Sequence, residues 1–212
     1  MQSQKKHPRF RREAPEKRRA DLVQAAIRCL SDGGMSAFKM ERIAAEAGVS
    51  LGLLPHYFTN KNELLAEVYR AALYDDVTRK IAELTDKEAS ASPTERLCRI
   101  MDAIIDPEYL RPANLTVWLA LWGEIVVNPE LRRAHRTLYR SYIKSLADLI
   151  GMVAAERRRT VNAPEIARSL QALIDGLFLE RALDRQAVDH ADFRRASYEY
   201  LELHLGKLPS AA

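Results

Sequence analysis

The stretch that decides the fold is AGVSLGLLPHYFTNKNELL, residues 47–65. Gly48 follows a short apolar segment, and glycine accepts the positive φ angle that a tight turn between two helices requires. Ser50 stands where its side chain can cap a new helix, which we expect to continue to about Phe58. Pro55 lies inside that helix and removes one of its backbone hydrogen-bond donors. Two short helices joined by such a turn form a helix-turn-helix.

The rest of the 212-residue chain also predicts helices and no strands. Apolar residues recur every three or four positions, and glycine and proline fall at the boundaries. Capping side chains followed by an acidic residue or a proline mark helix starts at Asn60, Ser92, Asn128, Asn162 and Asp189. The expected helices cover residues 17–31, 40–47, 50–58, 61–84, 93–107, 113–127 and 129–158, with two more after Asn162 and Asp189. We therefore expect an all-α fold of about nine helices.

Composition excludes several classes of protein. The most apolar run, residues 115–127, contains Glu124 and is shorter than the roughly 20 residues that a membrane span needs. Cys29 and Cys98 lie in apolar patterns without metal-ligand spacing, so we expect free thiols, no metal and a cytoplasmic protein. The five histidines are scattered, and no nucleophile motif or phosphate-binding glycine loop occurs. We therefore expect neither an enzyme nor a bound cofactor.

The start of the second short helix has the features of a DNA-reading surface. A helix N-terminus presents free N–H groups that suit phosphate, and a helix in the major groove needs to expose only a few residues. Leu51 and Gly52 offer little bulk and no base-specific hydrogen bonds. The side chains left to read bases are Ser50, His56, Lys39 and Arg42.

The segment ERIAAEAGVSLGLLPHYFTNKNELL, residues 41–65, resembles the DNA-binding domain of the TetR family of transcriptional regulators. The positions that match are Ile43-Ala44, Ala47-Gly48-Val49-Ser50, Gly52, Leu54, Tyr57-Phe58, Lys61 and Leu64-Leu65. The resemblance implies that Lys61, Tyr57 and Ser50 contact the DNA backbone. It also implies that Arg42 lies near the groove and that Leu54 and Phe58 are buried. The expected DNA-binding residues are Lys39, Arg42, Ser50, Leu51, Gly52, His56, Tyr57 and Lys61.

Two positions depart from this family pattern. Pro55 replaces a tyrosine that is common there, which deletes a phosphate contact, and Lys39 stands where Ser or Thr usually caps the second helix. Lys39 can instead supply a phosphate contact of its own.

Charge and helix length divide the chain into four expected parts. Residues 1–19 contain eight Lys/Arg and two Glu, a net charge of +6, so the remainder carries −2 of the total +4. A basic segment favours a polyanionic partner, although a solubilising tail has the same composition. We expect a basic flexible arm at 1–19, a three-helix DNA-binding domain at 20–66, a helical bundle for ligand binding and dimerisation at 67–207, and a tail at 208–212.

Two tryptophans, Trp118 and Trp122, lie four residues apart on one face of an expected helix. Such a pair is commonly part of a core, but indole rings with acidic neighbours can also hold a cation. The segments WLALW (118–122) and ALIDGLFLERAL (172–183) are similar to the C-terminal domain of the BetI-type branch, whose members repress glycine betaine synthesis and respond to choline. The expected ligand-binding residues are Tyr109, Trp118, Trp122, Glu124, Asp175 and Phe178.

The effector and the direction of regulation stay open at this point. Choline or another cationic amine is one hypothesis, and an unrelated apolar or amphipathic inducer of another pathway is the alternative. The resemblance implies a repressor, whereas the residues themselves permit an activator. A pure protein-interaction module is a further alternative.

Gly176 interrupts an apolar helix and costs about 1 kcal/mol relative to alanine, which close approach of a second helix would offset. The resemblance implies that the last two helices pair with those of a second copy, giving a homodimer that binds a pseudo-palindromic duplex. The residues expected at this interface, or in the core beside it, are Leu173, Gly176, Leu177, Phe193, Tyr200 and Leu201.

Overall fold

Helices are the only regular elements in residues 15–72 and 91–209, the ranges that the computed structural model describes. They are α1 (Pro15–Ala37), α2 (Met40–Glu46), η1 (Leu51–His56), α3 (Lys61–Arg70), α5 (Pro93–Ile104), α6 (Pro112–Val127), α7 (Pro129–Glu156), α8 (Ala163–Leu183) and α9 (His190–Leu205). For these residues the expected all-α fold with nine helices is confirmed. The expected continuation of α3 to residue 84 and most of the basic arm lie outside the described residues.

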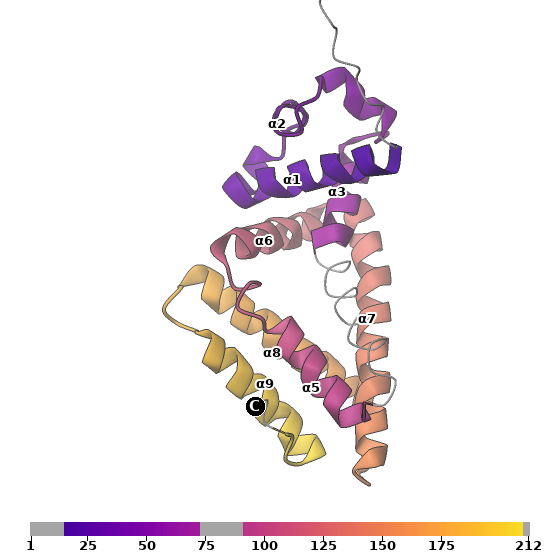
Figure 1. Ribbon diagram of the computed structural model, residues 1–212, viewed down its shortest axis with the longest axis vertical. Helices are drawn as coiled ribbons and strands as arrows, with labels where there is room; N and C mark the ends of the chain where they lie inside the picture. Colours follow the sequence, from indigo (N-terminus) through magenta and orange to yellow (C-terminus); the bar gives the residue numbers. More distant parts are fainter. Residues whose placement is uncertain (1–14, 73–90, 210–212) are drawn as a thin grey trace, which may run out of the picture.

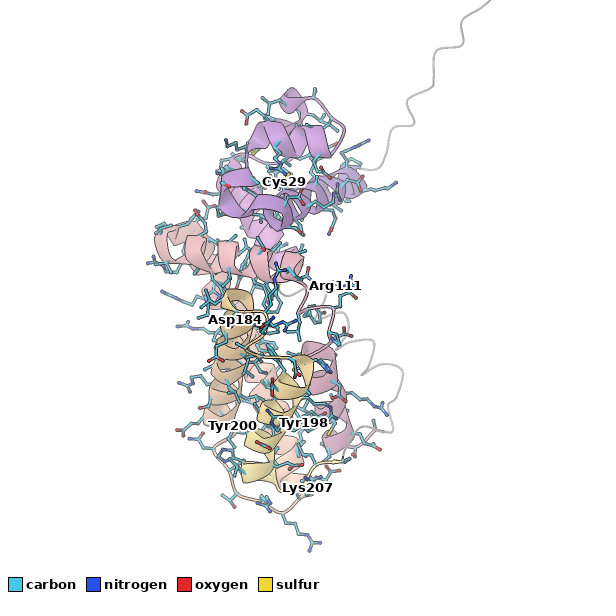
Figure 2. The ribbon with its side chains drawn as sticks, turned by 90° about the vertical axis from the view of Figure 1, so that its left-hand side faces the viewer. Cys29, Arg111, Asp184, Tyr198, Tyr200 and Lys207 are labelled. Carbon is cyan, nitrogen blue, oxygen red and sulfur yellow. The ribbon has the colours of Figure 1, made fainter. Side chains whose placement is uncertain are left out.

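The helices form a small head and a longer body (Figure 1). In the head, α1 lies between α2 on one side and α6 on the other, so α2 faces away from the body. Helix α7 runs along the body, where α5 and α8 pack against it, and α9 packs on α8. Cys29 lies in the head and Tyr198 and Tyr200 lie far from it on α9 (Figure 2).

Side-chain caps set the starts of the body helices. Ser92 Oγ accepts from the Glu95 backbone N–H at 3.2 Å, and the Glu95 carboxylate accepts from Ser92 N–H at 2.8 Å. Asp189 and Asp192 make the same reciprocal pair at the start of α9. The Asn128 side chain accepts from two N–H groups in the first turn of α7. The predicted helix starts are confirmed because a cap is decided by residues only a few positions apart.

Helix α1 differs from its prediction at the N-terminal end. It begins at Pro15, two residues before the expected start at Lys17, so the helix overlaps the last five residues of the segment 1–19 that we expected to form a flexible arm. The predicted break at the two glycines is present, because Gly33 and Gly34 have non-helical backbone angles and Gly34 has φ 59°.

The second helix of the helix-turn-helix is shorter and tighter than predicted. Instead of continuing to Phe58, η1 is a 3₁₀ turn of six residues that ends at His56. Pro55 explains the difference, because in an α-helix it would lack the N–H that bonds the Leu51 carbonyl and its ring would clash with that carbonyl. Ser50 precedes the turn but makes no capping hydrogen bond through its side chain, so the predicted cap is wrong.

The head core is completed by the body. Its fully buried members include Leu30, Phe38 and Leu54, which come from the head. The same cluster also contains Val117 and Leu121 of α6, together with Leu131 of α7. The two expected domains therefore share apolar contacts, although the body has a separate, larger core of its own.

Replacing Gly48 by alanine should destabilise the protein by about 1 kcal/mol. Gly48 has φ 66°, and a Cβ at this position meets no atom within 4 Å, so only backbone strain is added. Urea unfolding at fixed protein concentration measures the change. Gly52→Ala is the matched control, because its added Cβ also meets open space and its φ lies outside the left-handed range. Equal losses in the free energy of unfolding for both variants would show that a side chain at position 48 adds no backbone strain.

Candidate DNA-binding surface and effector site

The turn between α2 and η1 is closed by the backbone. Gly48 N–H donates to Ala45 O at 3.0 Å, and Val49 N–H donates to Ala44 O at 2.9 Å. Val49 packs partly on the head core. The positive φ of Gly48 allows a tight turn over residues 47–50, after which η1 begins at Leu51. This geometry is that of a helix-turn-helix.

Apolar side chains fix one face of η1 and leave the other exposed. Leu54 and the following Phe58 are buried at 0% and 2% exposure. Leu51 is 46% exposed, and Gly52, Pro55, His56 and the preceding Ser50 are also exposed. The exposed face is therefore mainly apolar and small, with a hydroxyl at its start and an imidazole at its end.

The basic residues that we expect to contact DNA lie on the elements beside η1. Lys39 is exposed directly before α2, and Lys61 is exposed as the first residue of α3, with its Nζ 5.4 Å from the Phe38 ring centre. Arg42 is exposed on α2 and pairs with Asp32 at 3.1 Å. Both side chains of that pair are about half exposed or more, so the pair contributes little and leaves Arg42 available for phosphate. Tyr57 is half-buried against the head core.

In the body, the aromatic residues named from the sequence form one cluster. The Trp118 ring centre lies 4.4 Å from Phe178, 6.2 Å from Tyr109 and 6.3 Å from Trp122. Phe178 continues to Phe193 at 4.9 Å. The cluster therefore joins α6, α8 and α9, and both indoles are only partly buried.

Asp175 lies one turn before Phe178 on α8. Burial raises the pKa of its carboxyl group to about 6, and the Gln171 amide, which donates to Asp175 at 2.7 Å, opposes this shift. Tyr139 of α7 is close enough for the Asp175 charge to contribute to a raised pKa of its hydroxyl group. Among the described residues, the Gln171 amide is the partner that acts on Asp175, and no basic side chain contributes to the pKa of its carboxyl group. A desolvated carboxylate without a counter-ion favours binding of a cation.

Glu124, which we expected at the ligand site, has a partner at the junction between the head and the body. Its carboxylate accepts from the Asn128 amide at 3.4 Å, and the same amide donates to Asn62 of α3 at 3.0 Å. Glu124 therefore belongs to the junction between α3 and the body. A second link is formed by the Tyr69 hydroxyl and His135 Nδ1, which are 2.6 Å apart.

Sequence reasoning missed this junction. Asn128 was recognised as a helix cap, but a cap uses only the side-chain oxygen. Asn128 is 7% exposed, so its buried amide N–H group needs a hydrogen-bond acceptor. That need is the feature from which a contact with another helix could have been predicted.

The residues expected at a dimer interface divide into two groups. Phe193 and Leu201 are 0% exposed within the protomer, so they are core residues and not surface contacts. Gly176 is exposed, and Leu173, Leu177 and Tyr200 are half-buried. A Cβ on Gly176 meets no atom of the described residues within 4 Å, so close packing among them does not explain this glycine.

The fold and the two sites define a helix-turn-helix DNA-binding regulator with a separate helical sensing body. Residues 22–68 match the bacterial regulatory proteins of the tetR family, and residues 93–206 match the C-terminal domain of BetI-type transcriptional repressors. The chain belongs to the TetR family and is a ligand-responsive transcriptional regulator, not an enzyme.

Individual relatives agree with this assignment. The HTH-type transcriptional regulator BetI 1 of Chromohalobacter salexigens is 33% identical over 92% of this chain and 94% of its own length. The crystal structure of a transcriptional regulator from Pseudomonas aeruginosa PAO1 is 32% identical, with a TM-score of 0.78 over 92% of this chain and 93% of that one. A regulator from Saccharomonospora viridis, solved in complex with choline, is 23% identical and shares the fold, with a TM-score of 0.70 over 88% of this chain and 96% of that one. No helix in the described ranges is long and apolar enough to cross a membrane.

Lys61→Ala should weaken binding to all duplex sequences by a similar factor, about three- to tenfold at moderate salt. Loss of one phosphate contact should also lower the slope of log affinity against log salt by about 0.9 per protomer. Fluorescence anisotropy with labelled duplexes measures both quantities. Lys144→Ala is the control, because Lys144 is exposed on α7 and pairs with Asp148 at 2.7 Å. An unchanged slope for Lys61→Ala would remove Lys61 from the phosphate contacts.

Proposed function

We propose that this regulator is a homodimeric repressor that leaves a pseudo-palindromic operator when it binds choline or a related cationic amine. The observation that carries the ligand assignment is the pair of partly exposed indoles one helix away from the uncompensated Asp175 carboxylate. The match to BetI-type repressors favours repression over activation. Because the proposed operator is part of the chromosome, we expect the regulator to act in the cytoplasm.

The chemistry of the site suits a quaternary ammonium group. Such a cation carries no N–H donors, so it gains from the faces of aromatic rings and from a nearby negative charge, and cation–π contacts contribute up to about 2 kcal/mol when desolvated. Phe178 holds Trp118 edge-on from α8, the helix that also carries Asp175. The choline complex of the S. viridis regulator supports the same ligand class on the same fold.

Helix α6 provides the connection to DNA binding. Trp122 contacts the body core, Trp118 contacts both cores, and their neighbours Val117 and Leu121 are buried in the head core. An effector that displaces the indoles rotates or shifts α6 and therefore changes the packing of the head. Binding prevents repression only if the effector prefers the head arrangement that does not fit DNA, and couplings of about 1–3 kcal/mol are typical.

Dimerisation is supported by the exposed side of α8. Ala172, Gly176, Leu179 and Leu183 are exposed at spacings of three and four residues, and Leu203 of α9 is 78% exposed. A stripe of small and apolar side chains on a long helix suits packing against a second copy. Two heads then meet two half-sites whose centres are about 34–36 Å apart or a multiple of that distance.

Choline affinity should rise about tenfold between pH 5 and pH 7.5. The pKa of Asp175 is raised to about 6, so its carboxylate becomes charged as pH rises through this value and then attracts a cation. Asp175→Asn should weaken choline binding by about tenfold at pH 7.5 and remove the pH dependence. Intrinsic fluorescence is a direct readout, because Trp118 and Trp122 are the chain's two tryptophans.

Three comparisons make this test specific. Asp148→Asn, an exposed carboxyl on α7, is the control variant and should behave like the unaltered protein. The uncharged choline isostere 3,3-dimethylbutan-1-ol should bind the unaltered protein more weakly, and Asp175→Asn should reduce that preference. Operator release by choline, followed by anisotropy, should shift in parallel with binding. Tight, pH-independent binding of the alcohol would instead support an apolar effector.

Gly176→Glu should convert the dimer to monomers by raising the dimer dissociation constant about 100-fold or more. The new side chain meets open space in the protomer but places a charge in the proposed interface, so the monomer should stay folded. Sedimentation equilibrium measures the association. Ser145→Glu, at an exposed position on α7, is the control and should leave the dimer intact. A fully dimeric Gly176→Glu protein would exclude this face as the interface.

A further inference from the structure

The 3₁₀ turn η1 of the helix-turn-helix depends on other parts of the head for its orientation. It has six residues, contains Pro55 and lacks a side-chain cap at Ser50. A 3₁₀ turn of this length forms too few hydrogen bonds to be stable alone, so its orientation depends on its neighbours. The packing of Leu54 and Phe58 into the head core holds one side of the turn. The contacts at the C-terminal end of η1 therefore help to set the orientation of its exposed face.

Arg19, near the start of α1, makes those contacts. Its guanidinium donates to the Tyr57 carbonyl, directly after η1, and lies 4.4 Å from the centre of the Phe58 ring. It also donates to Glu63 of α3 at 2.9 Å and approaches Glu67 at 3.4 Å. A single side chain therefore joins α1, the end of η1 and α3.

Glu63 completes the link from the other side. One carboxylate oxygen accepts from Arg19, and the second accepts from the Thr59 backbone N–H at 2.7 Å. The Arg19 hydrogen bond, followed by the bond from Thr59, lowers the pKa of Glu63 to about 2, so this carboxylate is charged at neutral pH. Residues 57 and 59, on both sides of Phe58, are thus held by one ion pair.

We propose that Arg19, together with Glu63, is a positioning residue for operator recognition that sets the orientation of η1 without contacting DNA. This inference rests on the DNA-binding function described above. Arg19 directs its donors to a carbonyl and two carboxylates inside the head, and its guanidinium stacks on Phe58, so few donors remain for phosphate. The fork of an arginine can bridge these acceptors, whereas a lysine ammonium cannot reproduce the same planar arrangement.

The test separates positioning from a direct phosphate contact by exchanging charges. Operator affinity is measured by anisotropy across a series of salt concentrations for Arg19→Gln, Arg19→Lys, Glu63→Gln and the double variant Arg19→Gln/Glu63→Gln. If Arg19 positions η1, all four variants lose operator affinity by about tenfold, and the slope of log affinity against log salt is unchanged. The double variant should bind no more weakly than the single variant with the lower affinity. The loss in Glu63→Gln is the sharpest result, because removing a negative charge near DNA should otherwise strengthen binding.

The opposite pattern overturns the proposal. If Arg19 contacts phosphate, Arg19→Gln lowers the salt slope by about 0.9 per protomer, Arg19→Lys retains affinity and Glu63→Gln binds as well as the unaltered protein or better. Arg70→Gln is the matched control, because Arg70 also pairs with Glu67 and carries one positive charge but does not contact η1. It should keep full affinity.

A structural readout shows whether the variants remain folded. Hydrogen exchange should accelerate at the Thr59 amide in Arg19→Gln and Glu63→Gln, while amides in the middle of α1 stay protected. Loss of protection throughout the head would show a general folding defect and overturn a specific positioning role. Failure of the unaltered protein and of Arg70→Gln to bind any duplex would instead contradict the DNA-binding function itself.

Discussion

One helix packs into two cores, and this constraint connects sensing to DNA binding. On α6, Val117 and Leu121 close the head core, Trp122 packs on the body core, and Trp118 packs on both cores. Packed interiors do not deform smoothly, so α6 cannot move in one core without changing its contacts in the other. The head is small, and buried residues of α6 and α7 complete its core, so its packing depends on the body. A ligand that acts on the indoles therefore acts on the head without a separate relay.

Two features of the body are unfavourable without a ligand: a desolvated carboxylate and two partly exposed indole rings. Asp175 is largely removed from water without a cationic partner among the described residues, and the indoles beside its helix are only partly covered. A cation of suitable size supplies the missing charge and covers the rings at the same time. By linkage, the same effector must bind less tightly to the protein on its operator, by the factor through which it weakens operator binding.

Local features of the fold were predictable from the sequence, and contacts between distant residues were not. The caps at Ser92 and Asp189 were predicted because their partners lie three residues away. Helical periodicity showed that Phe193 faces inward, but it could not tell a protomer core from a dimer interface, because both present apolar faces. The link from Glu124 through Asn128 to Asn62 could not be predicted, because Asn128 and Asn62 are 66 residues apart in the sequence. In the DNA-binding surface, family resemblance identified the positions, whereas the shortening of η1 followed from Pro55.

The exposed face of η1 carries a consequence for the kind of sequence it can recognise. On the face of η1 that we propose for the major groove, Leu51, Gly52 and Pro55 expose hydrocarbon between the hydroxyl of Ser50 and the imidazole of His56. Such a surface distinguishes bases chiefly by the C5-methyl group of thymine and by groove shape. Methylation of cytosine at C5 creates the same hydrocarbon feature. If η1 enters the groove as proposed, methylation of an operator cytosine beneath this hydrocarbon would change the affinity of the regulator.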